Sequence, residues 1–229
     1  MIIKNDNYMV ISDGSNNIAA AMKGLLNWDD GLYPSWAVIN AFHIFPQSEG
    51  NGVEPHYHDN DEFWLFTAGH GEIWLDGQNT KSTPNTVVYT PMGALQRFQM
   101  FTKGEMVALG TRLEREQRAG HLLVETDGRP IPTVEGFVVP GSDNTCPFPE
   151  RGSRCPLSEL RMVDLRAGER IGEEPLPFNE YWLVLSGIVS LTFGELNIEL
   201  VRGDLALLRS GLVFRIRCVR EAKVALARE

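Results

Sequence analysis

Two histidines and a glutamate lie close together in the segment PHYHDNDEFWLF. His56, His58 and Glu62 are separated by even numbers of residues, and in an extended chain such residues point to the same face. Two imidazoles and a carboxylate on one side form a ligand set for a divalent metal ion such as Fe, Mn, Ni or Zn, with positions left open for a substrate. The alternative is a solvated turn rich in Asp, Asn and Glu. The joint pattern, with Gly69 seven positions after the glutamate, favours the metal site.

Together with a later segment, these residues resemble the two sequence motifs of the cupin superfamily. The first motif, G(x)5HxH(x)3-4E(x)6G, is matched at its spacing by the two histidines, Glu62 and Gly69. The second motif, G(x)5PxG(x)2H, is similar to NTVVYTPMGALQRF, in which Gln96 stands in place of the last metal-binding histidine. The resemblance implies a jelly-roll β-barrel in which His56, His58 and Glu62 bind the metal and position 96 faces it.

The glutamine in the second motif leaves two roles open. An amide oxygen is a weaker, neutral ligand than an imidazole, although oxygen donors suit Mn, Fe or Mg. Gln96 is therefore either the fourth metal ligand or a group that stands back and hydrogen-bonds a substrate or water. If Gln96 does not bind the metal, His56, His58 and Glu62 are a complete set without it.

The composition narrows the class of protein. At 229 residues, with 43% hydrophobic and 22% charged residues, the chain is an ordinary globular protein of one large or two small domains. A net charge of −9 spread along the chain argues against a nucleic-acid partner, and no apolar run is long enough to cross a membrane. The N-terminus lacks the features of a signal peptide and the cysteines form no CxxC pair, so we expect a cytoplasmic protein with reduced thiols.

The chain repeats itself at an offset of 118 residues. NDEFWLFTAGHGEIWL aligns without a gap on FNEYWLVLSGIVSLTF, so that Glu62 pairs with Glu180. A period this long indicates a duplicated domain rather than a solenoid. At the other three ligand positions, the second copy carries residues that cannot hold a transition metal in the same way, namely Glu174, Leu176 and Phe214.

Short strands separated by turn signals about ten residues apart are typical of a sandwich or barrel, and Asp76-Gly77 predicts a hairpin turn. We therefore expect an all-β chain of two tandem cupin-type jelly-roll barrels with few short helices, a bicupin. Residues 1–112 would form the barrel with the metal site, 113–156 the connection, and 157–229 a C-terminal barrel without the ligands. That second barrel would cover a sheet edge or face of the first, or form the interface of a homodimer.

Individual segments carry further expectations. Apolar residues at helical spacing predict a short helix over residues 16–28. His43 lies within a predicted strand and is either packed in the core or facing the barrel. Residues 59–61 are expected to be solvated, and His121 has no partner at ligand spacing.

Aromatic residues near the metal motif are candidates for a substrate pocket. Trp64, Phe66 and Phe98 share the parity of the ligands and are expected to form an apolar wall, with Trp74 as a further inward candidate. The alternative is that these side chains are core residues, which is the commoner role of a large aromatic on a strand.

Three functions of different classes fit these features. The first is a metal-dependent enzyme that acts on a small polar substrate (a sugar, sugar acid or keto acid), with Lewis-acid isomerase, epimerase or lyase chemistry. The second is an Fe(II)-dependent dioxygenase, and the third a non-catalytic module that binds a small ligand. Gln96 in place of a third histidine favours the first over the second. A ligand set that is kept in only one of the two copies favours an enzyme over a binding module.

Overall fold

The computed structural model describes residues 2–3, 8–12, 18–22, 34–118, 120–124, 128–141, 148 and 155–229. The described residues form strands, turns and loops without an α-helix, so the prediction of an all-β chain is confirmed. The strands are β1 (Ile2–Ile3), β2 (Tyr8–Ser12), β3 (Ile18–Met22), β4 (Ile39–Gln47), β5 (His56–Tyr57), β6 (Glu62–Ala68), β7 (Gly71–Leu75), β8 (Gln78–Ser82), β9 (Val87–Thr90), β10 (Gln96–Met100), β11 (Gly104–Thr111), β12 (Leu122–Leu123), β13 (Phe137–Val139), β14 (Glu159–Leu165), β15 (Arg170–Pro175), β16 (Glu180–Phe193), β17 (Leu196–Val201), β18 (Leu205–Leu208) and β19 (Val213–Arg228).

The helix predicted over residues 16–28 is wrong where the structure describes it. Ile18–Met22 is strand β3, which pairs antiparallel with β2 in a separate two-stranded sheet. Pairing with a neighbouring strand satisfies backbone groups that a helix would satisfy internally, and such contacts often override a weak helical preference. The rest of the predicted helix lies outside the described residues.

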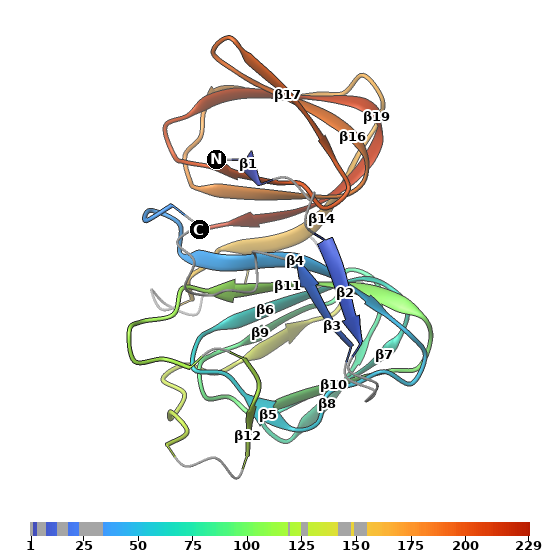
Figure 1. Cartoon of the computed structure of the whole chain (residues 1–229), viewed down its shortest axis with the longest axis vertical. Coiled ribbons are helices and arrows are strands. Elements are labelled where there is room, and N and C mark those ends of the chain that lie inside the picture. Colours follow the sequence, from blue (N-terminus) through green and yellow to red (C-terminus); the bar gives the residue numbers. More distant parts are fainter. Residues whose placement is uncertain are drawn as a thin grey trace.

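The N-terminal part of the chain forms two five-stranded antiparallel sheets, which lie one over the other in the lower half of Figure 1. The outer sheet has the order β12-β5-β10-β7-β8, and the middle sheet the order β13-β9-β6-β11-β4. Between the two sheets lies an apolar cluster that includes Trp64, Phe66, Phe98, Met100 and Met106. The metal-ligand candidates lie at one end of this space, so these two sheets are the scaffold of the site.

The C-terminal part of the chain, joined by β1 from the N-terminus, forms one seven-stranded sheet, the C-terminal sheet, with the order β1-β18-β16-β19-β14. β15 is added to β19 and β17 to β16, and the long strands β16 and β19 bend through register shifts, which let the sheet curl over its own apolar cluster. The curl is visible at the top of Figure 1. The expected closed barrels are not formed, because the C-terminal sheet ends in separate edge strands β1 and β14 and the N-terminal strands divide into two sheets.

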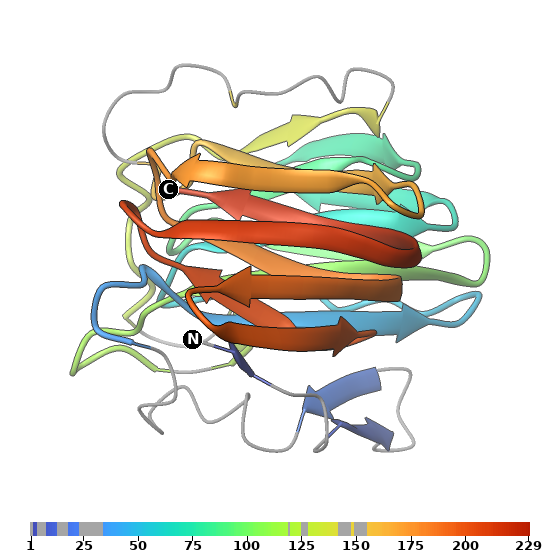
Figure 2. The same ribbon diagram turned by 90° about the horizontal axis from the view of Figure 1, so that it is seen from above.

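A second apolar layer joins the middle sheet to the C-terminal sheet. Phe42 and Leu65 from the middle sheet lie in one cluster with Leu183 and Leu207 from the C-terminal sheet, and all four are buried. Figure 2 shows the strands of the C-terminal sheet stacked over those of the N-terminal part. The middle sheet is therefore covered on both faces, which explains why its strands are apolar at nearly every position.

The sequence repeat reappears in the strand register. Glu62 lies opposite Gly110 in the pair β6–β11, and Glu180 lies opposite Arg228 in the pair β16–β19, so both partners are displaced by the repeat offset. Gly69 and Gly187 repeat a backbone conformation as well, with φ of +84° and +80°. A Cβ would approach backbone atoms to 2.8 Å at the first and 2.1 Å at the second, so glycine is needed at both.

Pairings also cross the predicted boundaries between the parts of the chain. Ile2–Ile3 pairs with β18 of the C-terminal sheet, although residues 1–112 were expected to form the first barrel. Leu122–Leu123 and Phe137–Val139, from the predicted connection, add β12 to β5 and β13 to β9. The hairpin at Asp76-Gly77 is confirmed between β7 and β8. None of the described segments is a helix with the length and hydrophobicity needed to cross a bilayer.

Candidate metal centre

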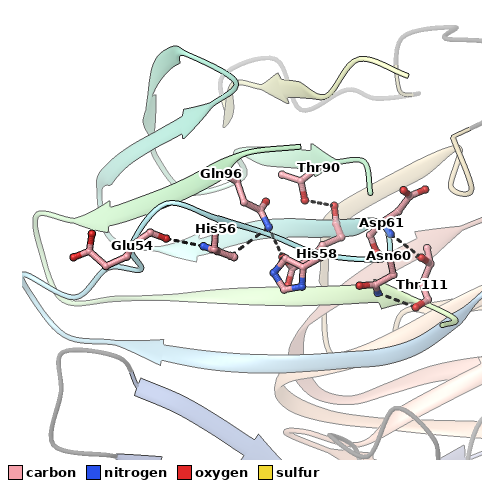
Figure 3. Close-up of polar contacts among 9 residues, drawn as sticks. Glu54, His56, His58, Asn60, Asp61, Thr90, Gln96 and Thr111 are labelled. Carbon is pink, nitrogen blue, oxygen red and sulfur yellow. Dashed lines mark hydrogen bonds and ion pairs between the residues drawn. The ribbon is translucent and has the colours of Figure 1, made fainter. Parts of the chain in front are cut away.

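Three strand ends bring the predicted ligands together. His56 starts β5, Glu62 starts β6 and Gln96 starts β10, and Gln96 lies directly opposite His56 in the antiparallel pair β10–β5. His58 follows β5 in the loop that leads into β6. All four residues are buried, and Figure 3 shows Gln96 reaching towards His56 and His58 from the neighbouring strand.

The polar atoms of the four side chains lie within a few ångströms of one another. Glu62 Oε2 is 3.3 Å from His58 Nε2 and accepts a hydrogen bond of 3.1 Å from Gln96 Nε2. Gln96 Nε2 is also 3.5 Å from His56 Nε2. His56 Nδ1 lies 2.7 Å from the backbone oxygen of Glu54, which can only accept, so Nδ1 carries the proton and Nε2 presents a lone pair to the cluster.

A third histidine, His121, completes this cluster, and sequence reasoning missed it. Its ring lies 4.3 Å from that of His56 and 5.1 Å from that of His58, between ring centroids. One ring nitrogen from each of the three histidines lies within 4.8 Å of the others, so the three together could hold a metal ion. His121 comes from the segment before β12, which folds back over β5, and no regular spacing in the sequence links it to the HxH pair.

The segment that carries His121 is fastened to the loop after β5. The Arg118 side chain donates from Nε to Asp59 Oδ2 at 2.7 Å and from Nη2 to Asp59 Oδ1 at 3.1 Å, and its backbone N–H donates to the same carboxylate. The hydrogen bonds from Arg118 hold the pKa of Asp59 below its usual range. This fork-to-fork pair ties Arg118, three residues before His121, to the loop after β5.

The loop over residues 59–61 is therefore not solvated as the sequence predicted. Asp59 and Asn60 are buried, and Asn60 Nδ2 donates to Thr111 O at 2.9 Å. Asp61 accepts from Tyr89 Oη at 3.1 Å and from the Met92 backbone at 2.8 Å. These polar residues are turned inward because the end of β11 and the loops after β9 and β11 offer them donors and acceptors.

The electrostatics of the cluster leave the Glu62 carboxylate only partly compensated. Burial lowers the pKa of His56 to about 3 and that of His58 to about 4, so both imidazoles are neutral near pH 7. The pKa of His121 is lowered as well, mainly because its ring is partly enclosed and to a lesser extent because His58 is close to it. Burial raises the pKa of Glu62 above its usual range, and the nearby His121 and the hydrogen bonds from Trp64 and Gln96 only partly offset the loss of water.

Two observations show that these residues fit a divalent metal ion. Both ring nitrogens of His58 and the amide oxygen of Gln96 are buried. None of these three atoms forms a hydrogen bond with a residue that the structure describes. A metal ion among the neutral imidazoles would take up unused lone pairs and balance the Glu62 carboxylate. In its present orientation the Gln96 amide points its N–H group at Glu62. Turning it over would place Oε1 towards the cluster, as a cation there would favour.

A cavity of about 50 Å³ opens beside the cluster. His56, Glu62 and His121 form its polar side, and Trp64 and Phe98 form part of its apolar wall. Phe66, predicted as a third pocket residue, is fully buried behind Phe98 and does not line the cavity. The residues that line this cavity within the described chain include no Lys or Arg, so nothing here is suited to a phosphate group.

Two further residues of the sequence analysis have clear positions. His43 is buried on β4 on the same side as Phe45, so it both lies in the core and faces the space between the outer and middle sheets. Burial lowers the pKa of His43 to about 3. Trp74 alternates with the buried Ile73 and Leu75 and points to the other face of β7, away from the site.

In the C-terminal sheet, an ion pair occupies the corresponding place. Glu180 Oε1 accepts from Arg228 Nε at 2.7 Å, and Glu180 Oε2 accepts from Trp182 Nε1 at 2.8 Å. Arg228 also donates from Nη1 to Glu159 Oε2 at 2.8 Å. Within the described part of the C-terminal half, no group of histidines, cysteines and carboxylates has metal-ligand spacing.

Comparison with known proteins identifies the fold. No protein-family model matches the chain, and no curated protein matches it in sequence. Among solved structures, AerE from Microcystis aeruginosa superposes with a TM-score of 0.57 at 10% identity, over 82% of this chain and 86% of AerE. The protein Ylba from E. coli gives 0.57 at 12% identity, over 84% and 78% of the two chains.

Two enzymes are also similar in structure. A single-residue variant of the oxalate decarboxylase OxdC from Bacillus subtilis gives a TM-score of 0.55 at 12% identity, over 82% of this chain and 67% of that one. A variant of salicylate 1,2-dioxygenase from Pseudoaminobacter salicylatoxidans gives 0.52 at 13% identity, over 82% and 70%. At such low identity the likeness speaks for the fold alone. These neighbours are cupin-fold proteins, and the all-β fold of this chain is that of the cupins.

Proposed function

We propose that the N-terminal part of this chain is a metal-dependent enzyme whose divalent ion is held by His56, His58 and Glu62. The observation that carries the proposal is the buried, only partly compensated Glu62 carboxylate beside the neutral imidazoles of His56 and His58. His121 and the amide oxygen of Gln96 are the further donors within reach of the same point. The C-terminal sheet is proposed to be a second copy of the cupin domain that has lost the ligands.

The residues around the ion would each have a distinct role. The bound metal would supply Lewis acidity, polarising a carbonyl or hydroxyl group of the substrate. The backbone oxygen of Glu54 holds the His56 ring so that Nε2 faces the ion. Trp64 and Phe98 exclude water from one side of the cavity. His121, at the exposed edge, is the group best placed to take or return a proton where it does not bind the ion.

The cavity bounds the substrate. About 50 Å³ beside the ligands accommodates only a few non-hydrogen atoms, so the reacting part of the substrate is small. The absence of Lys and Arg among the described lining residues favours an uncharged or singly charged group over a phosphate ester. A short keto or hydroxy acid, isomerised, epimerised or cleaved next to its carbonyl, fits these limits better than a whole sugar phosphate.

A second candidate, an Fe(II)-dependent dioxygenase, is favoured by the third histidine of the cluster. With His121 the site offers three histidines and one carboxylate, so Gln96 no longer counts against oxygen chemistry. The apolar wall of Trp64, Phe98 and Met106 also suits an apolar substrate.

Metal analysis tests the proposed site. The protein purified without added metal is expected to contain about one ion per chain, and the double variant His56→Ala/His58→Ala none, since two imidazoles are lost. His70→Ala, in an exposed turn, is the matched control and should keep the ion. Full metal occupancy in the double variant would reject the site.

Two assays separate the candidate reactions. A Lewis-acid enzyme is expected to exchange the C–H hydrogen next to the carbonyl of its keto acid with deuterium from solvent, without oxygen. A dioxygenase would instead consume oxygen with its substrate. Exchange or uptake that survives in the double variant would show that the reaction does not use this site.

A further inference from the structure

A cavity of about 490 Å³ opens on the inner side of the C-terminal sheet, much larger than the one beside the metal centre. It lies between β14, β15, β16 and β19. Glu180, Trp182 and Phe214 line it, at the repeat positions of Glu62, Trp64 and Gln96. Its volume falls in the range of small-molecule sites, about 300–1,000 Å³.

The charged residues at the base of this cavity form a balanced group of two arginines and two glutamates. Arg228 donates to both Glu180 and Glu159, and Arg161 forms an ion pair with Glu159. Both arginines line the cavity, and about one third of each side chain is exposed to it or to solvent. The group is neutral as a whole, so an added anion meets no unbalanced carboxylate there.

The guanidinium of Arg161 has N–H groups that are not used within the described part of the chain. The structure gives its terminal Nη1 and Nη2 groups no hydrogen bond to any residue that it describes. The edge formed by these two nitrogens is the part of a guanidinium that binds a carboxylate through two parallel hydrogen bonds. A cavity that contains such an unused edge is prepared for an anionic group.

The walls of the same cavity are apolar. They are formed by Val163, Ile171, Leu176, Phe178, Trp182 and Phe214. Phe178 is 51% exposed, which is unusual for so large an apolar side chain and leaves its ring free to cover a ligand. At the rim, Arg215 pairs with Glu173 at 2.8 Å, and Glu174 is exposed, so water screens its charge.

We propose that this cavity is a second ligand site, which binds a small carboxylic acid with an apolar body. The carboxylate would lie on the Nη edge of Arg161, and the body would lie against Trp182, Phe214 and Phe178. The site is separate from the metal centre, because the layer of buried side chains between the middle and C-terminal sheets lies between them. It needs no metal, and its permanent cations are part of the chain.

Binding measurements with matched ligand pairs test this site. Benzoate, phenylacetate and hexanoate are compared with benzamide, phenylacetamide and hexanamide by calorimetry on the full chain, with inorganic phosphate as a further probe. At least one acid is expected to bind about tenfold or more tightly than its amide, since a charge-assisted bidentate pair is lost in the amide. The bound acid should also shift the indole N–H resonance of Trp182.

Three variants locate the binding. Arg161→Gln is expected to abolish the preference for acid over amide, while Arg97→Gln, on an exposed position of β10, should leave it unchanged. The variant His56→Ala/His58→Ala, which disables the metal centre, should bind the acid as well as the native protein.

The proposal is overturned by any of four results. These are no preference for acids over amides, an unchanged preference in Arg161→Gln, loss of acid binding in the metal-site variant, or phosphate binding as tight as that of the acids. The Trp182 resonance in the native protein gives an answer even if Arg161→Gln fails to fold, because an unshifted signal at saturation also rejects the site.

Discussion

Two glutamates at equivalent positions of the repeat are buried in the same way but compensated differently. Glu62 and Glu180 each begin a central strand, and each is followed two residues later by a tryptophan that hydrogen-bonds it. Glu180 lies opposite Arg228, whose guanidinium binds it directly. Glu62 lies opposite Gly110, which has no side chain to offer.

A second pair of equivalent residues, His43 and Arg161, shows the same contrast between a neutral and a charged side chain. His43 lies opposite Ala108, and Arg161 lies opposite Leu226, so both occupy one place in the repeat. The first is a buried neutral imidazole and the second a permanent cation. The fold thus supplies a buried carboxylate twice. The C-terminal sheet compensates it with arginine, whereas the N-terminal sheets surround it with neutral donors that an ion can use.

The largest test removes the built-in cation. Replacing Arg228 by Met leaves Glu180 and Glu159 buried with a single arginine nearby, and breaking a buried ion pair from one side costs about 3–5 kcal/mol. We expect the free energy of unfolding, measured in urea, to fall by about that amount. Arg217→Met, on the exposed side of the same strand, is the control, with an effect within about 0.5 kcal/mol. Equal losses in both variants would break the comparison.

The next test uses pH, because in the pair His43 and Arg161 only the histidine can change its charge in the accessible pH range. The pKa of His43 is lowered to about 3 by burial, against about 6.5 in the unfolded chain. Below pH 6.5 the unfolded chain therefore binds a proton on this histidine that the native state does not bind. The free energy of unfolding falls as the pH falls towards 4. In the presence of chelator, His43→Leu should reduce this slope by up to about 1.4 kcal/mol per pH unit.

Thermal or urea unfolding between pH 4.5 and 7.5 measures this slope. His70→Leu, at an exposed turn, is the matched control for the loss of an imidazole. A slope in His43→Leu that is as steep as in the native protein would show that this histidine is not held neutral in the fold.

A smaller effect of opposite sign is expected at Glu62. Burial raises the pKa of Glu62, so its charged form is disfavoured in the metal-free protein near pH 7. Glu62→Gln removes that charge and should stabilise the chelator-treated protein by about 1–2 kcal/mol while weakening metal binding. Urea unfolding with and without metal measures both. If Glu62→Gln destabilises the metal-free protein, its carboxylate already has a cationic partner and the contrast with Glu180 is wrong.

Much of the fold could be predicted because it depends on local pattern. The apolar, aromatic-rich runs FWLF and EYWLVL predict strands and the offset of 118 predicts a duplication, and the structure shows strands β6 and β16 with equivalent register. The strand Ile18–Met22 could not be predicted, because its pairing with β2 overrides the helical spacing of its residues. The sequence also could not predict that the sheets stay open. Closure of a sheet into a barrel depends on which distant edge strands pair and on where bulges bend long strands.

The site was predictable in part for the same reason. Strand parity and the cupin motifs placed His56, His58, Glu62 and Gln96 near one another, and the structure brings these four together. His121 was missed because its position depends on a loop folding back, which leaves no period in the sequence. The role of Arg228 could have been found, since extending the repeat alignment to the C-terminus places it on Gly110.

The smallest test concerns how that loop is held. Arg118→Ala removes the side-chain bonds to Asp59 and frees the segment that carries His121. We expect metal affinity, measured by competition with a chelator, to fall about tenfold, as for other residues that orient a ligand. Arg115→Ala, an exposed residue of the same segment, should change nothing. Because the loss acts through His121, the variant His121→Ala and the combined variant Arg118→Ala/His121→Ala should weaken metal binding to the same degree. Additive losses would mean that Arg118 affects the ion by another route, and His121 would then be a neighbour of the centre rather than one of its ligands.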